Sequence, residues 1–379
     1  MTSRAARRKS ERRTIDGASR ARALDTLLAS VVSVTEFRDL AMDVLADDAF
    51  DYVDGGSWDE LTLAENDAAW LRRRLRPRVL VDVAAVSTTT TMIGQAISMP
   101  VAIAPMAAHG LAHPDGEGAT VRAAAAADVP LILSTMSSRS IEEVAAIAPD
   151  GIRWFQLYHQ GDQGRSRALV ERAEAAGYRA IILTVDLPVL GYRERDRRSG
   201  FRLADSLGNF GDATPTHVNR GAGSTPPTDQ LSRSMTWDDL ALIRSWSALP
   251  LVLKGILTAE DARLAADQGV AAIVVSNHGA RQLDRTAATV DVLEEVVAAV
   301  AGRSEVWVDG GVRRGLDVAI ALALGARGVL VGRPILYALA TGGAPAVERA
   351  LAILRAELEI ALALIGAPTP ADVIRSHVV

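Results

Sequence analysis

The stretch LVLKGILTAEDARLAADQGVAAIVVSN, residues 251–277, contains one complete unit of the fold. It begins with a short apolar run, continues with a polar segment whose apolar residues recur at helical spacing, and ends with a second apolar run. Short apolar runs are typical of strands buried on both faces, and Gly269 is typical of a helix end. The stretch therefore predicts a strand, a helix and a second strand, with the two strands parallel.

The same unit recurs along most of the chain. The predicted strands are VAIAP (101–105), LILST (131–135), RWFQLY (153–158), AIILTVD (180–186), LVLKGI (251–256), AIVVSN (272–277), EVWVDGG (305–311) and VLVGRP (329–334). Amphipathic helical stretches separate them. Eight alternating units favour a closed barrel over an open doubly wound sheet, so the predicted fold class is α/β, a (β/α)8 TIM barrel.

The segments outside these units divide the rest of the chain. Residues 1–20 are basic and lack apolar periodicity, and we expect a disordered lead. Residues 21–98 are predicted to form a helical segment that packs on the barrel, which occupies residues 99–379. The insert 199–235, after the fourth strand, is rich in Gly, Pro, Ser and Thr. Loops of this length are uncommon and are usually lids or disordered, and a passive surface loop is the alternative.

Composition restricts the function. The 379 residues carry a net charge of −5 and include no cysteine, which excludes disulfides, thiolate metal sites and a cysteine nucleophile. The mild charge gives no reason to expect nucleic acid or a membrane as a partner. Because the basic start lacks an apolar stretch and no run could span a bilayer, we expect a soluble, cytoplasmic protein. His109 and His113 have helical spacing without the acid of an HExxH motif, so no metal site is expected.

Polar residues follow the predicted strands at the point where each one ends. They are Ser134 and Thr135, Gln156 and Tyr158, Thr184 and Asp186, Lys254, Ser276 to His278, Asp309, and Arg333. Active sites of such barrels lie at the carboxyl ends of the strands, and buried polar groups cost free energy unless they are paired. The pattern therefore predicts a functional site at this rim. Lys254 is one of only two lysines in the chain, which makes its place inside an apolar run conspicuous.

The loops after the last two strands resemble an anion site. DGGVRRG (309–315) and VGR (331–333) are glycine-bearing turns that lead into helices and carry arginines. Backbone amides at a helix start and arginine side chains together form a cradle for phosphate, and these two loops are its usual place in a barrel. The alternative is that the glycines only close tight turns and the arginines are solvated. We favour a ligand that carries one phosphate.

His278 is the candidate general base. A lone histidine is more often structural, but His278 lies between a strand end and a glycine, with Arg281 close behind. An arginine can bind a carboxylate through two hydrogen bonds while a neighbouring imidazole accepts a proton. Asp186 could orient that imidazole and stabilise its charged form. Alternatively, Asp186 only caps the turn VDLP.

Several long motifs together resemble the FMN-dependent α-hydroxy acid oxidase and dehydrogenase family, whose members act on acids such as glycolate, lactate and mandelate. The resemblance covers nearly the whole chain from Phe50 onward. The motifs are FDYVDGG (50–56), WFQLY (154–158), LTVDLPVLGYRERD (183–196), LVLKGI (251–256), VSNHGARQLD (275–284), VDGGVRRG (308–315) and GRP (332–334).

The resemblance implies roles for individual residues in substrate binding and catalysis. His278 would accept a proton during oxidation of the α-carbon, paired with Asp186. Tyr158 would hydrogen-bond the substrate hydroxyl group, and Arg281 would bind the carboxylate. The implied substrate-binding residues are Tyr52, Met136, Tyr158, Arg193 and Arg281. Met136 stands where several members have an aromatic or a small residue, so the substrate pocket is not transferable.

The resemblance also implies that the cofactor is FMN and not FAD or NAD. Lys254 would lie beside the N1–O2 edge of the flavin, where its charge stabilises the reduced cofactor. The flavin ring would be held by Pro105, Met106, Ala107, Ser134, Gln156, Thr184 and Ser276, and the ribityl phosphate end by Asp309, Gly311, Arg313, Gly332 and Arg333.

The implied reaction is oxidation of an L-2-hydroxy acid to the 2-oxo acid, with O2 as acceptor and hydrogen peroxide as product. Two alternatives share the fold: a dehydrogenase that reduces a quinone or a redox protein, and oxidative decarboxylation as in lactate 2-monooxygenase. A phosphate-binding barrel without redox chemistry is a third. The family resemblance further implies a homotetramer.

The sequence gives two conflicting indications of the substrate. Residues 107–113 are more similar to lactate oxidases than to glycolate oxidase, whereas Met136 favours a larger substrate side chain.

Overall fold

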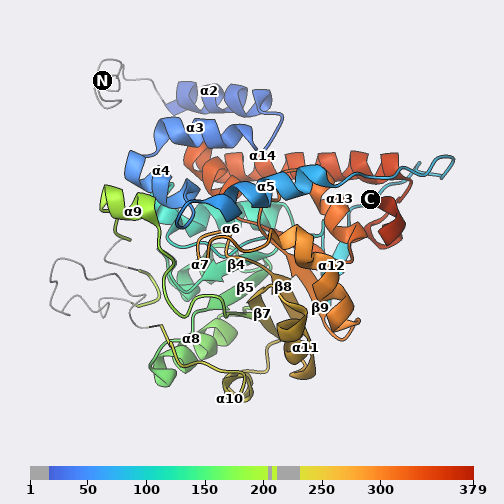
Figure 1. The fold of residues 1–379 in the computed structure, drawn as a ribbon. Coiled ribbons are helices and arrows are strands. Elements are labelled where there is room, and N and C mark those ends of the chain that lie inside the picture. Colours follow the sequence, from blue (N-terminus) through green and yellow to red (C-terminus); the bar gives the residue numbers. More distant parts are fainter. Residues whose placement is uncertain (1–16, 204–206, 211–230) are drawn as a thin grey trace. The chain divides into compact units, whose positions relative to one another are not determined.

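A computed structural model describes residues 17–203, 207–210 and 231–379 (Figure 1). The chain divides into two compact units, residues 1–32 and 33–379. The first unit contains helix α2 (Gly17–Ser30). This helix begins inside the segment that we expected to be disordered, because its alanines, arginines and leucines are strong helix formers. Residues 1–16 of that segment lie outside the described residues.

The second unit is built around the predicted barrel. Its strands are β3 (Val101–Ile103), β4 (Leu131–Ser134), β5 (Arg153–Leu157), β6 (Ile181–Thr184), β7 (Leu251–Ile256), β8 (Ala272–Val275), β9 (Glu305–Val308) and β10 (Gly328–Val331). Each strand pairs in parallel with its neighbours, and β10 pairs with β3, which closes the sheet. The prediction of eight parallel strands in a closed barrel is confirmed.

Helices follow the strands and surround the sheet (Figure 1). They are α6 (Glu117–Ala126), α7 (Ile141–Ile147), α8 (Gln163–Ala175), α9 (Glu194–Ser199), α10 (Asp239–Ser245), α11 (Ala259–Asp267), α12 (Thr289–Val300), α13 (Gly315–Ala323) and α14 (Arg333–Ile365), with the short 3-10 turn η1 (His109–Leu111) before α6. Gly177 and Gly269 follow α8 and α11 with φ of 78° and 67°, the left-handed conformation of a helix end. The prediction of a helix end at Gly269 is confirmed.

A hairpin contacts the barrel core from the side where the strands begin. It consists of β1 (Thr90–Met92) and β2 (Gln95–Ile97), which pair antiparallel. Two tryptophans of the core stack there, Trp154 and Trp307, with ring centroids 5.1 Å apart. Gln95 accepts a hydrogen bond from the Trp154 indole at 3.2 Å, and Trp307 donates to Glu305 at 2.9 Å. The strands of this hairpin are too short to produce a sequence pattern, and it was not predicted.

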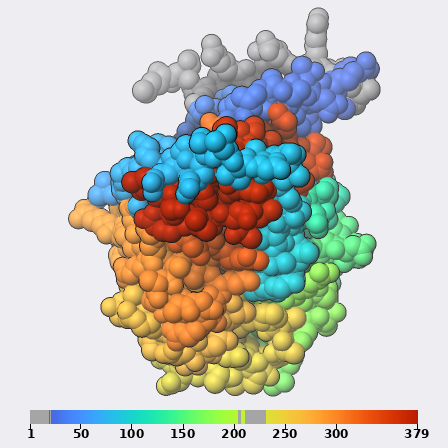
Figure 2. Space-filling model, turned by 90° about the vertical axis from the view of Figure 1, so that its right-hand side faces the viewer, coloured from blue at the N-terminus to red at the C-terminus, as the bar shows by residue number. Residues whose placement is uncertain are grey.

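The predicted helical segment before the barrel consists of α3 (Glu36–Val44), α4 (Asp47–Asp54) and α5 (Leu61–Arg72). The expected break at Gly55–Gly56 separates α4 from α5. α3 and α4 contact α14, α5 contacts α12, and α4 also contacts α9. The segment after α5 runs beside the chain end with its 3-10 turns η4 (Pro370–Asp372) and η5 (Arg375–His377), and Leu75 bridges Val378 (Figure 2).

Only parts of the insert 199–235 are described, namely 199–203, 207–210 and 231–235. Leu207 and Leu231 are buried in a cluster with Met136 and Leu187. Asn209 is also buried, and its amide donates to the backbone carbonyl of Thr135 at 3.0 Å. Leu207, Asn209 and Leu231 of the insert thus pack on the loop after β4. In the described part of the chain, no helix has the length and apolar character needed to cross a membrane.

Candidate active site

A pocket lies at the rim where the barrel strands end. Five of the predicted strand-end residues line it on the barrel side together with the two glycine-bearing loops, and α4 contributes to the opposite side. The lining includes Tyr52, Val53, Pro105, Met106, Ala107, Met136, Tyr158, Leu187, Leu190, Arg193, Leu203, Lys254, His278, Arg281, Asp309, Gly310, Gly311, Arg313, Gly332 and Arg333. The structure therefore brings together most of the residues that the sequence indicated.

His278 and Asp186 form a hydrogen-bonded pair inside this pocket wall. The Nδ1 atom of His278 lies 2.8 Å from Oδ1 of Asp186. Asp186 follows β6 and packs on Gly255 of β7, where a Cβ atom would come within 2.6 Å of the Asp186 Cβ. Gly255 has a φ of 116°, so a side chain there would be excluded by conformation as well as by space. The glycine of LVLKGI thus makes room for the acid that orients the histidine.

The electrostatics of the pair suit a general base. Burial lowers the pKa of His278, although the negative charge of Asp186 acts in the opposite direction. Burial would raise the pKa of Asp186, but the interactions with His278 and Lys254 hold it below its ordinary value. At neutral pH the imidazole is therefore neutral, with Asp186 ionised beside it. A neutral ring held at Nδ1 leaves Nε2 free to accept a proton.

The backbone at His278 is in an unusual conformation. Its φ is 60°, in the left-handed region, and Ala280 has a φ of 61°. Residues with side chains seldom adopt this conformation, and it costs of the order of 1–3 kcal/mol where the surrounding structure imposes it. Here the backbone amide of His278 donates to Ser276 Oγ at 3.1 Å, which holds the turn. Strain of this kind is common at functional sites.

Tyr158 lies over the other ring nitrogen of His278. Its hydroxyl group is 3.3 Å from Nε2, and the two rings are stacked with centroids 6.4 Å apart. Burial raises the pKa of Tyr158, so its phenol stays protonated. The phenol and the imidazole therefore point at one small region of the pocket, where a substrate hydroxyl group could contact both.

Lys254 is buried and fully paired on the barrel side of the pocket. Its Nζ atom lies 3.1 Å from Oδ2 of Asp309 and donates to Ser276 Oγ at 2.8 Å. Burial would lower the pKa of Lys254, but the charges of Asp309 and Asp186 outweigh it and raise the pKa. The ammonium group is therefore charged, in a place where water is scarce.

The residues predicted to hold the flavin ring form a hydrogen-bonded row beneath the lining residues. Ser134 donates to Gln156 Oε1 at 3.3 Å, and Gln156 donates to Thr184 at 3.0 Å. Ser134 Oγ also accepts the backbone amide of Met136 at 3.1 Å. All three side chains are buried. This row fixes the strand ends against which a flat ring could lie.

Two arginines and a tyrosine form the opposite, cationic side of the pocket. The guanidinium carbon of Arg281 lies 4.8 Å from the centre of the Tyr52 ring. Arg193 is buried, and its Nε donates to the backbone carbonyl of Arg281 at 3.2 Å. Burial and the charge of Arg281 lower the pKa of Arg193 to about 10, so it remains charged at neutral pH. Two adjacent cations that line one pocket form a suitable site for an anionic substrate.

The predicted phosphate cradle needs one correction. The amides of Arg313 and Arg314 donate to Asp317 at 2.8 and 2.9 Å, and that of Gly315 donates to Glu357 at 2.7 Å. Carboxylates of the protein therefore already satisfy the start of α13, as acids often do in the first turn of a helix. The remaining donors of the cradle are the glycine turns and the arginine side chains.

Those arginines have their own contacts in the structure. Arg313 pairs with Asp67 at 3.2 Å. Arg333 donates to three backbone carbonyls, those of Val53, Gly55 and Gly279, at 2.8 to 3.1 Å. Burial lowers the pKa of Arg333 to about 10, which leaves it charged at neutral pH.

The chain matches known proteins over nearly its whole length. The sequence profile described as FMN-dependent dehydrogenase matches residues 41–379. The chain belongs to this family. Among curated relatives, the L-lactate oxidase of Nostoc sp. is 48% identical, over 92% of this chain and 98% of that protein. Glycolate oxidase 1 of Oryza sativa subsp. indica is 46% identical, over 93% and 96%.

Solved structures give the same result. The structure of a mandelate oxidase with (S)-4-hydroxymandelic acid is 43% identical, covers 91% of this chain and 98% of that chain, and has a TM-score of 0.86. The resemblance inferred from the motifs is confirmed. The protein is an FMN-dependent oxidoreductase, and its cofactor is FMN, as predicted.

The pocket of this chain fits FMN on observations of its own. Asp309 lines the pocket, and its Oδ1 atom is buried without a hydrogen-bond partner among the described residues. A ribityl hydroxyl group would supply that partner. Gly332 also lines the pocket, where the missing side chain lets a ligand approach the backbone. The charged Lys254 and Arg333 suit an anionic cofactor.

Some pocket residues carried no signal in the sequence. Leu187 and Leu203 line the pocket, and Phe201 stacks on Tyr52 with centroids 4.4 Å apart. These apolar side chains come from loops without periodicity, so nothing in the sequence pattern distinguished them. Val189 lines an adjoining hollow with Trp58, and Leu190 lines both this hollow and the pocket.

Proposed function

We propose that this protein oxidises an (S)-2-hydroxy acid to the 2-oxo acid with FMN and transfers the electrons to O2, which forms hydrogen peroxide. The similarity to proteins named lactate, glycolate and mandelate oxidase supports this class of reaction. The observation that carries the proposal is that His278, hydrogen-bonded to Asp186, lines one pocket together with the cations Arg281 and Arg193.

The cofactor would be held by the residues on the barrel side of the pocket. The flavin ring would lie against Pro105, Met106, Ala107, Ser134, Gln156, Thr184 and Ser276, and the ribityl phosphate against Asp309, Gly311, Arg313, Gly332 and Arg333. Bound FMN supplies the acceptor for two electrons from the α-carbon of the substrate. Lys254 would place a positive charge beside the ring.

The substrate would be oriented by its carboxylate. Arg281 and Arg193 would bind the carboxylate, together with the hydroxyl group of Tyr52. With the carboxylate fixed, the hydroxyl group would reach Tyr158, and the proton to be removed would reach Nε2 of His278. Asp186 would then stabilise the protonated ring through Nδ1. Met136, Leu187 and Leu190 would surround the substrate side chain.

The test is anaerobic mixing of the purified holoenzyme with 2-hydroxy acids of both configurations. Loss of the flavin absorbance with (S)-acids, followed by rapid recovery and one equivalent of peroxide when O2 is admitted, is the expected result. Slow reoxidation by O2 with rapid reoxidation by a quinone would assign the protein to the dehydrogenases. Carbon dioxide in place of peroxide would indicate oxidative decarboxylation, and a flavin that no 2-hydroxy acid reduces would refute the proposal.

Assembly, compartment and domain limits belong to the same proposal. We propose a homotetramer, on the family resemblance, with residues 99–379 as the FMN-binding barrel, and a cytoplasmic location. Light scattering on the purified protein measures the number of subunits. Limited proteolysis of the holoenzyme measures the limits of the barrel, and cell fractionation measures the location. A monomer or a membrane-bound fraction would contradict the corresponding part.

A further inference from the structure

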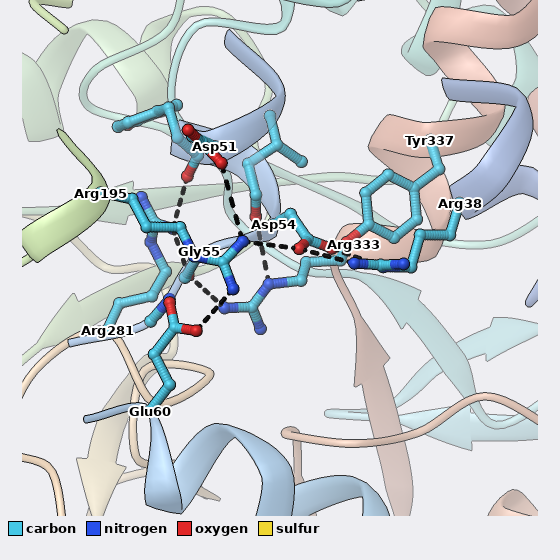
Figure 3. A network of polar contacts seen from close by, with 12 residues as sticks. Arg38, Asp51, Asp54, Gly55, Glu60, Arg195, Arg281, Arg333 and Tyr337 are labelled. Carbon is cyan, nitrogen blue, oxygen red and sulfur yellow. Dashed lines mark hydrogen bonds and ion pairs between the residues drawn. The ribbon is translucent and has the colours of Figure 1, made fainter. Parts of the chain in front are cut away.

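Asp54, the last residue of α4, is buried at the centre of an ionic network next to the pocket (Figure 3). Its carboxylate accepts two hydrogen bonds from Arg38, at 2.7 and 2.9 Å. It accepts a third from Arg195 at 3.0 Å and a fourth from Tyr337 at 2.7 Å. The Asp54 side chain is only 7% exposed. Burial would raise the pKa of Asp54, but these hydrogen bonds outweigh it and hold the pKa at about 2.

Arg195 connects this carboxylate to two other elements. It belongs to α9, two residues after Arg193, and also binds Glu60 at 2.5 Å. Glu60 in turn accepts the backbone amide of Gly56 at 2.8 Å. In Figure 3 the Arg195 guanidinium lies between the acids of α4 and Glu60. α9, α4 and the turn after α4 are therefore held together by one side chain.

The same turn is bound to the arginines of the pocket. Arg281 donates to the backbone carbonyls of Tyr52 and Gly55, at 2.6 and 3.0 Å. Arg333 also donates to the carbonyl of Gly55, at 2.9 Å. The carboxyl end of α4 carries partial negative charge, which favours such cations. The position of this helix end therefore sets where the Arg281 guanidinium lies.

We propose that Asp54 and Arg195 are positioning residues for substrate carboxylate recognition. They hold α4, which carries Tyr52 and anchors Arg281, in a fixed position relative to the start of α9, where Arg193 lies. The inference rests on the proposed function, because it assumes that these three residues bind the carboxylate. Neither Asp54 nor Arg195 lines the pocket, so they act through their neighbours.

Arg38 provides a matched control. It binds the same carboxylate as Arg195 and belongs to α3, which carries none of the proposed carboxylate-binding residues. The variants are Asp54→Asn, Arg195→Gln and Arg38→Gln. Each is compared with the parent holoenzyme for kcat, KM, melting temperature and the Kd of FMN. The Kd of the 2-oxo acid and of its neutral amide, read from the flavin spectrum, measures recognition of the carboxylate separately from catalysis.

Asp54→Asn and Arg195→Gln should weaken binding of the acid about tenfold, equivalent to about 1.4 kcal/mol, with the amide unaffected. KM should rise with kcat nearly unchanged, since the contact serves ground state and transition state alike. The double variant should weaken acid binding by less than the product of the two single effects, because both changes break the contact between Asp54 and Arg195. Arg195→Lys, which keeps the charge, should restore part of the affinity. Arg38→Gln should lower the melting temperature without changing the preference for the acid.

Acid binding equal to that of the parent in folded, FMN-loaded Asp54→Asn and Arg195→Gln would overturn the inference. The same holds if Arg38→Gln weakens acid binding as much as Arg195→Gln does. Should Asp54→Asn fail to fold, Arg195→Gln alone decides, because its side chain is 31% exposed and its loss is more easily tolerated. Arg281→Lys distinguishes failure of this inference from failure of the proposed function. If Arg281→Lys also leaves acid binding unchanged, the proposed carboxylate site itself is wrong.

Discussion

The two sides of the pocket are built in different ways. On the barrel side, Asp186, Lys254 and His278 follow directly from the ends of β6, β7 and β8, and hydrogen-bonded strands fix their positions. On the other side, Tyr52 lies on α4 and Arg193 at the start of α9, outside the sheet. In the proposed function, the barrel side would handle the proton and the helical side would bind the carboxylate.

This difference affects how precisely the side chains on each side are positioned. Neighbouring strands are joined by a ladder of backbone hydrogen bonds, so strand-end residues need few further contacts to keep their places. Helices outside a barrel have no such ladder, and their positions depend on side-chain contacts. The network of Asp54, Arg195 and Glu60 supplies these contacts. Changes on the barrel side should therefore act on the chemical step, and changes on the helical side mainly on binding.

The largest effect should follow from removing the base on the barrel side. His278→Ala should slow anaerobic flavin reduction by about 10²–10⁴-fold, the usual contribution of a positioned acid–base group. FMN should stay bound, since the His278 imidazole contacts Asp186 and Tyr158, which are not among the proposed cofactor-binding residues. Stopped-flow absorbance measures the rate, and His113→Ala, outside the pocket, is the control. A decrease of less than tenfold would mean that another group takes the proton.

The sequence could predict the barrel side because its information is local. A short apolar run predicts a strand, and the polar residue after it must then lie at the rim, as it does for Asp186 and His278. The helical side was accessible only through the family motifs. Tyr52 and Arg281 are separated by more than two hundred positions, and no periodicity indicates that they meet.

Other features were missed because they depend on contacts between distant residues. Asp317 looked like any helical acid, yet it binds the amides that we assigned to a phosphate. Asp54 gave no signal, because its partners Arg38, Arg195 and Tyr337 come from three separate helices. Ionic networks of this kind are decided by packing, which single-sequence patterns do not record.

A second prediction concerns the arginine that joins the two sides. Arg281→Lys keeps the charge but loses the planar group that binds Tyr52 and Gly55 carbonyls while facing the pocket. Hydrogen bonds to charged groups contribute about 1.5–3 kcal/mol, so kcat/KM should fall by about 10–100-fold. Steady-state kinetics with the best acid measures it. An unchanged kcat/KM would place the carboxylate on Arg193 alone.

The pH dependence should reflect the base on the barrel side. Burial lowers the pKa of His278, and only the neutral ring accepts a proton. kcat/KM should therefore be level through neutrality and fall on the acidic side, below the ordinary histidine pKa of about 6.5. At pH values below the pKa of His278, kcat/KM should fall by nearly tenfold per pH unit. The acidic limb should be absent in His278→Ala, and a limb that persists in that variant would belong to another group.

The smallest effect concerns the substrate side chain, where the two sides of the pocket meet. Met136 is buried beside the pocket, with Leu187 and Leu190 nearby. A flexible thioether can yield space that a fixed aromatic ring would deny, and Ala107 adds no bulk. We therefore expect mandelate or a branched hydroxy acid to give a kcat/KM at least equal to that of glycolate. The lactate-oxidase-like residues 107–113 argue instead for lactate, so the panel should include it.

The preference should be graded, because one methylene in an apolar pocket is worth only about 1–3 kcal/mol. Met136→Trp should reduce kcat/KM for mandelate more than for glycolate, since the indole would fill the space that a phenyl group needs. Leu264→Trp is the matched control, because Leu264 is exposed on α11 and does not line the pocket. If glycolate is the best substrate of the parent and mandelate is inert, Met136 does not set the size of the pocket. In that case the limit would come from the helical side, where Tyr52 and Phe201 stack above Arg281.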